Sequence, residues 1–174
     1  MNRIYTAVFI LVISIIPTVS ISDQVQINIT AKVMAKTCTV ASESRNFLVN
    51  LDSGDLRGAQ VGVPFSYSPF TVKLEDCSLN INTAHLSFSG ESDAILPDLL
   101  NNSGATGLEA DGIALALFNQ DKKRIDIRDN TTSFAINHAG SETALSFFAA
   151  YVKTKDTASA GKITSFANFD ISYD

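Results

Sequence analysis

The sequence predicts an all-β domain of the β-sandwich type. About eight short segments alternate apolar and polar residues, and turns rich in Gly, Asn, Asp or Pro separate them. We find neither the 3.6-residue period of a full-length helix nor an internal repeat. Short strands with a turn about every 8–12 residues are typical of two antiparallel sheets packed face to face.

The last stretch, Gly161 to Asp174, has the most regular alternation. Ser165 is the weak member of its apolar face, and Phe166 interrupts its polar face. The apolar face carries Ile163, Ala167, Phe169, Ile171 and Tyr173. A two-residue period with one apolar face predicts a half-buried strand. Since no later segment of this sequence can pair with its outer edge, we expect something else to cover that edge.

Residues 1–22 predict a secretory signal peptide. Arg3 supplies a positive charge, residues 7–16 form an apolar core, and Ser20 and Ser22 stand at the −3 and −1 positions of the expected cleavage site. The alternative, a membrane anchor, needs about 20 apolar residues, and no later stretch is long and apolar enough to span a membrane. Removing 22 of the 174 residues leaves 152, which suits one domain with a sizeable core.

Charge and motifs argue against several function classes. Without Arg3 the mature chain has 12 basic and 18 acidic residues, a net charge of −6, which disfavours nucleic acid and anionic membranes as partners. The chain has two histidines, His85 and His138, and His85 is expected to be a surface or structural histidine. Counting alone leaves a Ser-His-Asp arrangement open, but the Gly-x-Ser-x-Gly elbow of many serine hydrolases is absent. We therefore expect no enzymatic activity and no cofactor, since a phosphate-binding glycine loop is also absent.

Two further patterns carry little information. Asp121, Asp126 and Asp129 surround a predicted hairpin and resemble solvated turn residues more than a calcium loop, which needs dense oxygen ligands. Asn28 and Asn130 begin formal glycosylation sequons, which matter only on a eukaryotic secretory route.

Cys38 and Cys77 are the two cysteines of the chain. An even count in an exported chain predicts one disulfide. Closing a loop of roughly 40 residues stabilises a fold by about 4 kcal/mol in the chain-entropy model. The Cys-x-x-Cys spacing of a redox site is absent, and two cysteines without nearby ligands do not form a zinc site, so we expect no metal.

A second alternating stretch, Asp23 to Lys36, precedes the first cysteine. One of its faces is polar, and the other carries Val25, Ile27, Ile29, Ala31 and Val33. Periodicity alone favours an ordinary first strand of the sandwich. Its position also allows the segment to leave the body of the domain, and its main-chain groups and alternate apolar side chains suit a bare sheet edge.

The remaining predicted strands are short. The first, Asn46–Leu51, has an apolar face of Phe47, Val49 and Leu51. Residues 54–69 are expected to be a loop because they carry three glycines and two prolines, and residues 91–111 are expected to be mostly loop with a short helical turn at 94–100. The other predicted strands are Phe70–Leu74, Ala84–Ser89, Gly112–Asn119, Arg124–Ile127, Thr131–Asn137 and Glu142–Thr154.

Taken together, these motifs resemble those of chaperone–usher pilin subunits, close to the minor or adaptor subunits of type 1 fimbriae of Gram-negative bacteria. The resemblance covers Asp23–Asp174 and rests on the order and spacing of several motifs. They are the alternating N-terminal segment, KTCTVASES around Cys38, NFLVNL, PFTVKLEDC ending at Cys77, LSFSGESD, DGIALALFNQDKKRI and ALSFFAAYVKT. The end of the chain is the most specific part, with Tyr173 in the penultimate position and Gly161 fourteenth from the C-terminus.

The resemblance implies an incomplete immunoglobulin-like sandwich that lacks its last strand, so that a groove borders the final strand of the chain. A donor strand from a neighbour completes such a fold, which is a form of β-augmentation. By analogy, residues 23–36 are the donor-strand extension and residues 37–174 the pilin domain. The implied donor residues are Val25, Ile27, Ile29, Ala31 and Val33. The implied acceptor groove is lined by Phe47, Val49, Leu51, Ile163, Ala167, Phe169, Ile171 and Tyr173.

The implied function is that of a structural subunit of an adhesive surface fimbria. Its implied partners are a periplasmic pilus chaperone, an outer-membrane usher and neighbouring pilin subunits, and its route runs through the periplasm to the cell surface. The chaperone would anchor the carboxylate of Asp174. One departure is Ala31, where family extensions usually carry Gly, so its methyl group bears on how the donor seats.

Two alternatives from other classes stay open. The first is a carbohydrate-binding adhesin, although 152 residues leave no room for a separate lectin domain ahead of a pilin domain. The second is a self-contained secreted sandwich, such as an inhibitor or a degenerate hydrolase, which would fold without the N-terminal segment.

Overall fold

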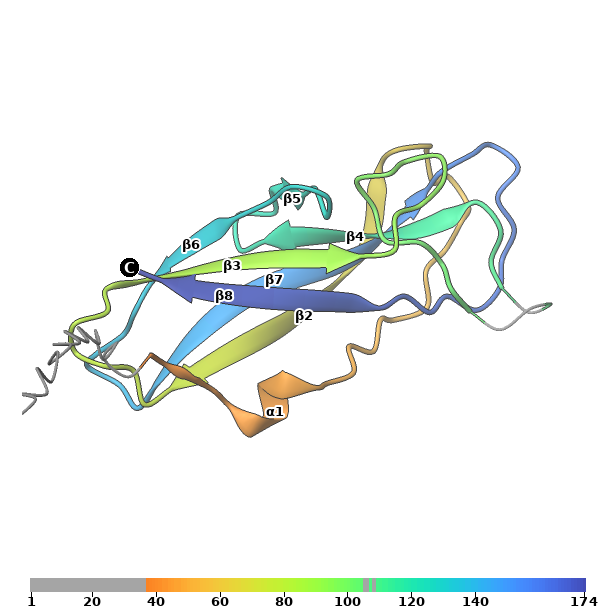
Figure 1. The fold of residues 1–174 in the computed structure, drawn as a ribbon. Helices are drawn as coiled ribbons and strands as arrows, with labels where there is room; N and C mark the ends of the chain where they lie inside the picture. Colours follow the sequence, from red (N-terminus) through yellow and green to blue (C-terminus); the bar gives the residue numbers. More distant parts are fainter. Residues whose placement is uncertain (1–36, 105–106, 108) are drawn as a thin grey trace, which may run out of the picture. The chain divides into compact units, whose positions relative to one another are not determined.

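The protein folds as two antiparallel β-sheets packed face to face, which confirms the predicted all-β sandwich (Figure 1). The computed structural model describes residues 37–104, 107 and 109–174. The predicted signal peptide and donor-strand extension lie outside these residues. Every pairing between the named strands is antiparallel. Short strands joined by turns produce this arrangement because a parallel pair needs a long crossover connection.

The larger sheet has the strand order β1-β2-β7-β4-β5. β2 (Pro64–Glu75) and β7 (Glu142–Lys153) are its longest strands, with 12 residues each. β4 (Ile113–Asn119) lies on the far side of β7, and the two-residue strands β1 (Thr39–Val40) and β5 (Arg124–Ile125) form the edges. Because β1 pairs only with the last two residues of β2, most of the outer edge of β2 has no partner strand among the described residues.

The smaller sheet has the strand order β6-β3-β8. β3 (Thr83–Gly90) lies between β6 (Thr132–Ala135) and β8 (Ala167–Tyr173). Figure 1 shows β3 and β8 running side by side across the sandwich from β7. The ring of Phe88 on β3 meets the ring of Phe147 on β7, with centroids 4.9 Å apart, and this contact joins the two sheets.

The main core lies between the sheets and consists of inward-facing residues of both. Phe147 is fully buried at its centre, and its ring centroid lies 5.5 Å from that of Phe70 and 5.4 Å from that of Phe134. Aromatic pairs of this kind add about 0.5–1.5 kcal/mol beyond the burial of their area. The predicted disulfide between Cys38 and Cys77 is present and ties the start of β1 to the connection that follows β2.

A second, smaller cluster covers the outer face of the larger sheet and explains why β4 is apolar on both sides. The leucines of β4 point into the main core, whereas its alanines face outward. These small side chains allow the loop at residues 91–100 to pack closely on the sheet. The cluster consists of Leu99, Ala114, Ala116, Phe118, Ala150 and Val152, with Tyr67, Leu96 and Phe148 packed against it.

Two segments near the start of the described chain differ from the prediction. The predicted strand Asn46–Leu51 was wrong: this segment joins no sheet and follows a short helix, α1 (Ser42–Arg45), which the sequence pattern did not indicate. The predicted loop at 54–69 ends at residue 63, because β2 begins at Pro64. Proline is tolerated at the first residue of a strand or beside a bulge, and Pro69 follows the register shift of β2 against β7.

The final strand is shorter than predicted, because residues 161–166 leave the ladder of the smaller sheet. The amide of Ser103 donates to the carbonyl of Thr164 at 2.7 Å, and this bond holds the departing segment beside the loop at residues 101–110. A Cβ added at Gly161 would collide with the backbone of that loop, so only glycine fits this approach. The expected helical turn at 94–100 is a non-helical turn in the structure.

Asn130, which begins a formal glycosylation sequon, is a structural residue. Its side-chain amide donates to the carbonyls of Phe88 at 2.8 Å and Asp126 at 2.7 Å, and its oxygen accepts from the amide of Phe88 at 2.8 Å. The side chain thereby replaces a neighbouring strand next to Phe88, where β6 no longer pairs with β3. This role accounts for Asn130 without any modification.

Candidate functional site

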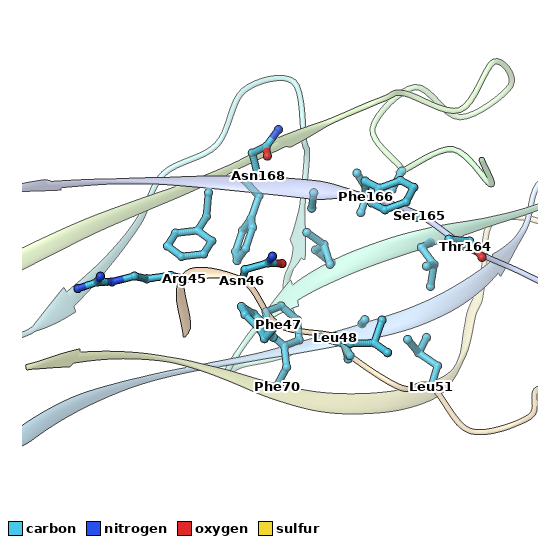
Figure 2. A pocket seen from close by; sticks show the side chains of 18 residues that line it. Arg45, Asn46, Phe47, Leu48, Leu51, Phe70, Thr164, Ser165, Phe166 and Asn168 are labelled. Atoms are coloured by element: carbon cyan, nitrogen blue, oxygen red, sulfur yellow. The ribbon is translucent and has the colours of Figure 1, made fainter. Parts of the chain in front are cut away.

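A groove opens where β8 and β2 form free edges of the two sheets (Figure 2). Its volume is about 840 Å³. One wall is the segment 45–51, and the other is the segment 164–169, which leads into β8. The floor consists of inward-facing side chains from four strands and one loop, namely Phe70, Phe88, Leu100, Leu115, Leu117 and Ala149. We call this feature the inter-sheet groove.

The wall formed by residues 164–169, here called the upper wall, continues into β8, and the outer edge of β8 is free. One side of β8 pairs with β3 over seven residues, from Ala167 opposite Gly90 to Tyr173 opposite Ala84. On its other side, no strand of the described chain is hydrogen-bonded to it. An edge of this kind presents a row of unpaired N–H and C=O groups, which are ready to pair with another extended segment.

The opposite wall is extended but has no ladder of its own. Among the described residues, no hydrogen bond joins the backbone of residues 47–51 to another segment. Before it, α1 is fixed to β2 by polar contacts, since the Ser44 hydroxyl accepts from the amide of Lys73 at 3.0 Å. The Lys73 ammonium donates a hydrogen bond to Glu142, and this bond raises the pKa of Lys73. The negative charges of Glu142 and Glu43 raise it as well. The wall is therefore anchored at α1, while residues 47–51 keep their main-chain groups available.

The lining of the groove is mostly apolar. Arg45 is the only charged side chain among the described lining residues, and its Nε donates to the carbonyl of Val40 at 3.0 Å instead of pointing at a ligand. The groove therefore has the character of a sandwich core that lacks one strand. Burial raises the pKa of the Tyr173 phenol at the end of β8.

Comparisons with known proteins agree with this geometry. The model of the fimbrial protein family matches residues 27–174. The chain belongs to this family. Long polar fimbria protein A of Salmonella typhimurium is 30% identical over 155 residues, covering 85% of this chain and 83% of that protein. The S-fimbrial protein subunit SfaG of Escherichia coli is 31% identical over 148 residues, covering 84% and 82%.

Solved structures show the same fold. The crystal structure of the P pilus rod subunit PapA superimposes with a TM-score of 0.61 at 18% identity, covering 80% of this chain and all of that one. A type I fimbria protein and antigen of Burkholderia pseudomallei superimposes with a TM-score of 0.58 at 23% identity, covering 80% of this chain and 91% of that one. The protein is thus a pilin, a structural subunit of a surface fimbria.

The structure distributes the sequence-predicted acceptor residues of this pilin over three places. The inter-sheet groove is lined by Phe47, Val49, Leu51, Ala167 and Phe169. Ile163 lines an adjoining pocket of about 290 Å³, which shares Leu51 with the groove. Ile171 and Tyr173 are half-buried and pack against the main core without lining either cavity. The predicted donor residues lie outside the described chain.

Sequence reasoning missed the floor of the groove. Its six residues stand on inward faces of β2, β3, β4 and β7 or in the loop before β4, and each fits an ordinary core position. Their alternation in the sequence predicts burial, but only the topology shows that they lie below a gap between sheet edges. The departure of residues 161–166 from the ladder of the smaller sheet was visible only as an interruption of the alternating pattern at Phe166.

The Ser-His-Asp arrangement that counting left open does occur, at a distance from the groove. His85 Nε2 lies 2.6 Å from Asp174 Oδ2, and its Nδ1 lies 2.9 Å from the Ser133 hydroxyl. The three side chains stand on the outer face of the smaller sheet, one on each strand or its end, and none of them lines either cavity. A catalytic serine needs an oxyanion site and a bound substrate, so we interpret His85 as a link across β6, β3 and the end of β8.

His138 is a structural histidine. Its Nε2 donates to the carbonyl of Ile81 at 2.7 Å and ties the turn after β6 to the connection between β2 and β3. Among the residues that the structure describes, no helix is long and apolar enough to cross a membrane.

Proposed function

We propose that the inter-sheet groove binds the extended N-terminal segment of a neighbouring subunit, and that the pilin enters its fimbria by donor-strand exchange. The single observation that carries this proposal is the free edge of β8 beside an apolar groove of about 840 Å³. A bare edge of this kind invites pairing with any extended chain. In a fibre, that chain would come from the next subunit.

The two walls suit a single inserted strand. An extended segment in the groove would pair with β8 on one side, and its other edge would face residues 47–51, whose main-chain groups are also available. Both edges of the inserted strand would then be satisfied, so the assembled fibre would have no exposed edge at this place. The floor would receive every second side chain of the strand, because side chains alternate between the two faces.

The segment Asp23–Lys36 has the pattern that this groove requires. Its apolar face carries Val25, Ile27, Ile29, Ala31 and Val33. Burying five such side chains gives roughly 7–13 kcal/mol before costs, with Ala31 contributing least, and this is an upper bound. The gain is comparable to the net stability of a whole domain, about 5–15 kcal/mol. A pilin with an empty groove should therefore be marginal, and one with a filled groove very stable.

The division of the chain follows from this proposal. Residues 1–22 would be removed as a signal peptide, residues 23–36 would serve as donor strand, and residues 37–174 would form the pilin domain. In the periplasm a chaperone would fill the groove before an outer-membrane usher passes the subunit into the fibre. A contact of this kind is head-to-tail and does not close, so it generates a filament.

The position of this pilin in the fibre is a further part of the proposal. The resemblance of its motifs to minor or adaptor subunits supports an adaptor position. Counting the subunits of isolated fimbriae by quantitative mass spectrometry tests this position. We expect this chain in far fewer copies than the main rod subunit, and equal or greater abundance would contradict it.

Hydrogen exchange tests the groove proposal directly. A synthetic peptide of residues 23–36 is added to the mature chain, and exchange of the backbone amides is followed by NMR or mass spectrometry. We expect protection by at least about tenfold in β8 and in residues 47–51. The matched control peptide carries Ile29→Asp, which places a charge in the apolar floor and should give no protection. Unchanged exchange in β8 with the native peptide would contradict the proposal and favour a self-contained sandwich.

A further inference from the structure

We propose that two copies of this pilin also touch through their folded bodies, with Leu79 of one copy packed against Leu48 and Phe166 of the next. This inference rests on the proposed function, since the inserted strand brings the two bodies together. It adds a contact between exposed side chains of the groove walls in one copy and Leu79 of the next copy, which lines neither cavity.

The starting observation is the exposure of these three side chains. Leu79 is 84% exposed, Leu48 81% and Phe166 74%. The other exposed large apolar residues of the described chain reach at most 52%, at Ile95. Contiguous exposed apolar patches mark interaction sites on protein surfaces. Side chains from the two ends of a domain form such a patch when an assembly brings the two ends together.

Leu48 and Phe166 line opposite walls of the groove and keep most of their surface exposed to solvent. Figure 2 shows them on opposite walls, in the half of the groove that precedes β8. Leu51 and Phe169 of the same walls pack against the main core, whereas Leu48 and Phe166 remain largely exposed. Most of the surface of these two side chains is therefore free to contact a second body at the rim of the groove.

Leu79 lies at the other end of the domain, where the described chain begins. It stands two residues after Cys77, and the disulfide brings Cys77 next to Cys38, with a Cα–Cα distance of 4.0 Å. In every copy, the donor segment therefore leaves the body beside its own Leu79. From Val33 to Cys38 the chain has five residues, a reach of about 17 Å at most.

The direction of the inserted strand decides which ends meet. All strand pairs of this sandwich are antiparallel, and antiparallel pairing is the more stable per residue. An antiparallel partner of β8 ends where β8 begins, at Ala167, which follows Phe166 directly. The body of the donor copy, with its Leu79, then stands at the end of the groove that Leu48 and Phe166 flank.

The test compares polymer stability with strand binding in the mature chain, residues 23–174. The variants are Leu79→Ser, Phe166→Ser and the double variant, and Ile95→Ser is the control because it is exposed, apolar and lines neither cavity. Subunit loss from preformed polymers is timed in guanidinium. Binding of a peptide of residues 23–36, which has no body, is measured separately.

We expect each single variant to release subunits about tenfold faster, the double variant to be no faster than either single one, and Ile95→Ser to match the wild type. Peptide binding should be the same in Leu79→Ser and wild type, because Leu79 lines neither cavity of the described chain. Two results would overturn the body contact while leaving the groove proposal intact. One is polymers of wild-type stability in both single variants, and the other is a release rate of the double variant that equals the product of the two single effects. If the wild-type chain binds no peptide, the groove proposal fails first and this contact fails with it.

Discussion

Phe169 offers the sharpest test of how the groove recognises a strand. Its side chain is partly buried in the upper wall, with its ring centroid 6.4 Å from that of Phe88. Replacing a fully buried Phe by Ala costs about 3–5 kcal/mol. Because about two thirds or more of Phe169 is already covered in the empty groove, we assign at most about a third of the cost, about 1–1.7 kcal/mol, to strand binding. Phe169→Ala should therefore weaken peptide binding by about 5–20-fold.

The assay is calorimetric titration of the mature chain with a peptide of residues 23–36. Leu79→Ala is the control, since it removes an apolar side chain that is 84% exposed and lines neither cavity. It should bind the peptide as the wild type does. Far-UV circular dichroism verifies that both variants are folded. Binding of Phe169→Ala within about twofold of wild type, or an equal loss in both variants, would refute the assignment of Phe169 to the groove.

Three further predictions follow from other parts of the structure. Asn130→Ala should lower the free energy of unfolding by about 1.5–4.5 kcal/mol, because three backbone hydrogen bonds are lost, two of them with Phe88; a loss below 0.5 kcal/mol in urea would contradict this role. Replacing Cys38 and Cys77 by Ala should cost about 2–5 kcal/mol, measured in the same way against the oxidised wild type. Burial raises the pKa of Tyr173, so its contribution to stability is present below about pH 10 and is lost as the pH rises above that value. Peptide binding should raise this pKa further in a spectrophotometric titration, and no change would argue against burial of Tyr173 by the inserted strand.

Several elements of the fold could be read from the sequence because their patterns are local. The alternation in residues 84–89, 112–119 and 142–154 corresponds to β3, β4 and β7 within one or two residues. A two-residue period reports one buried face, as in β3, whereas β4 is buried on both faces and keeps the period by alternating leucine with alanine. The cysteine count likewise predicted the disulfide, since an exported chain with two cysteines has one pairing available.

Other parts depend on long-range packing, which the sequence does not display. Residues 46–51 alternate like a strand, yet no strand lies beside them in the described chain, so the pattern reports a wall of the groove. Tyr67 and the alanines of β4 form the second cluster only because a loop folds over the outer face of the larger sheet. Leu100 and Ala149 belong to the groove floor for the same reason, because their position below a free edge follows from the strand order alone.

The account stands on the claim that the sandwich lacks one strand next to β8. The most direct measurement is thermal unfolding of two chains that both begin at Thr37. One ends at Asp174, and the other continues through a short flexible linker into a copy of residues 23–36. The linker leaves the end of β8, so the added strand can return along its free edge as an antiparallel partner. We predict that the extended chain unfolds at a far higher temperature, by tens of degrees, whereas equal unfolding temperatures would show that the sandwich is already complete.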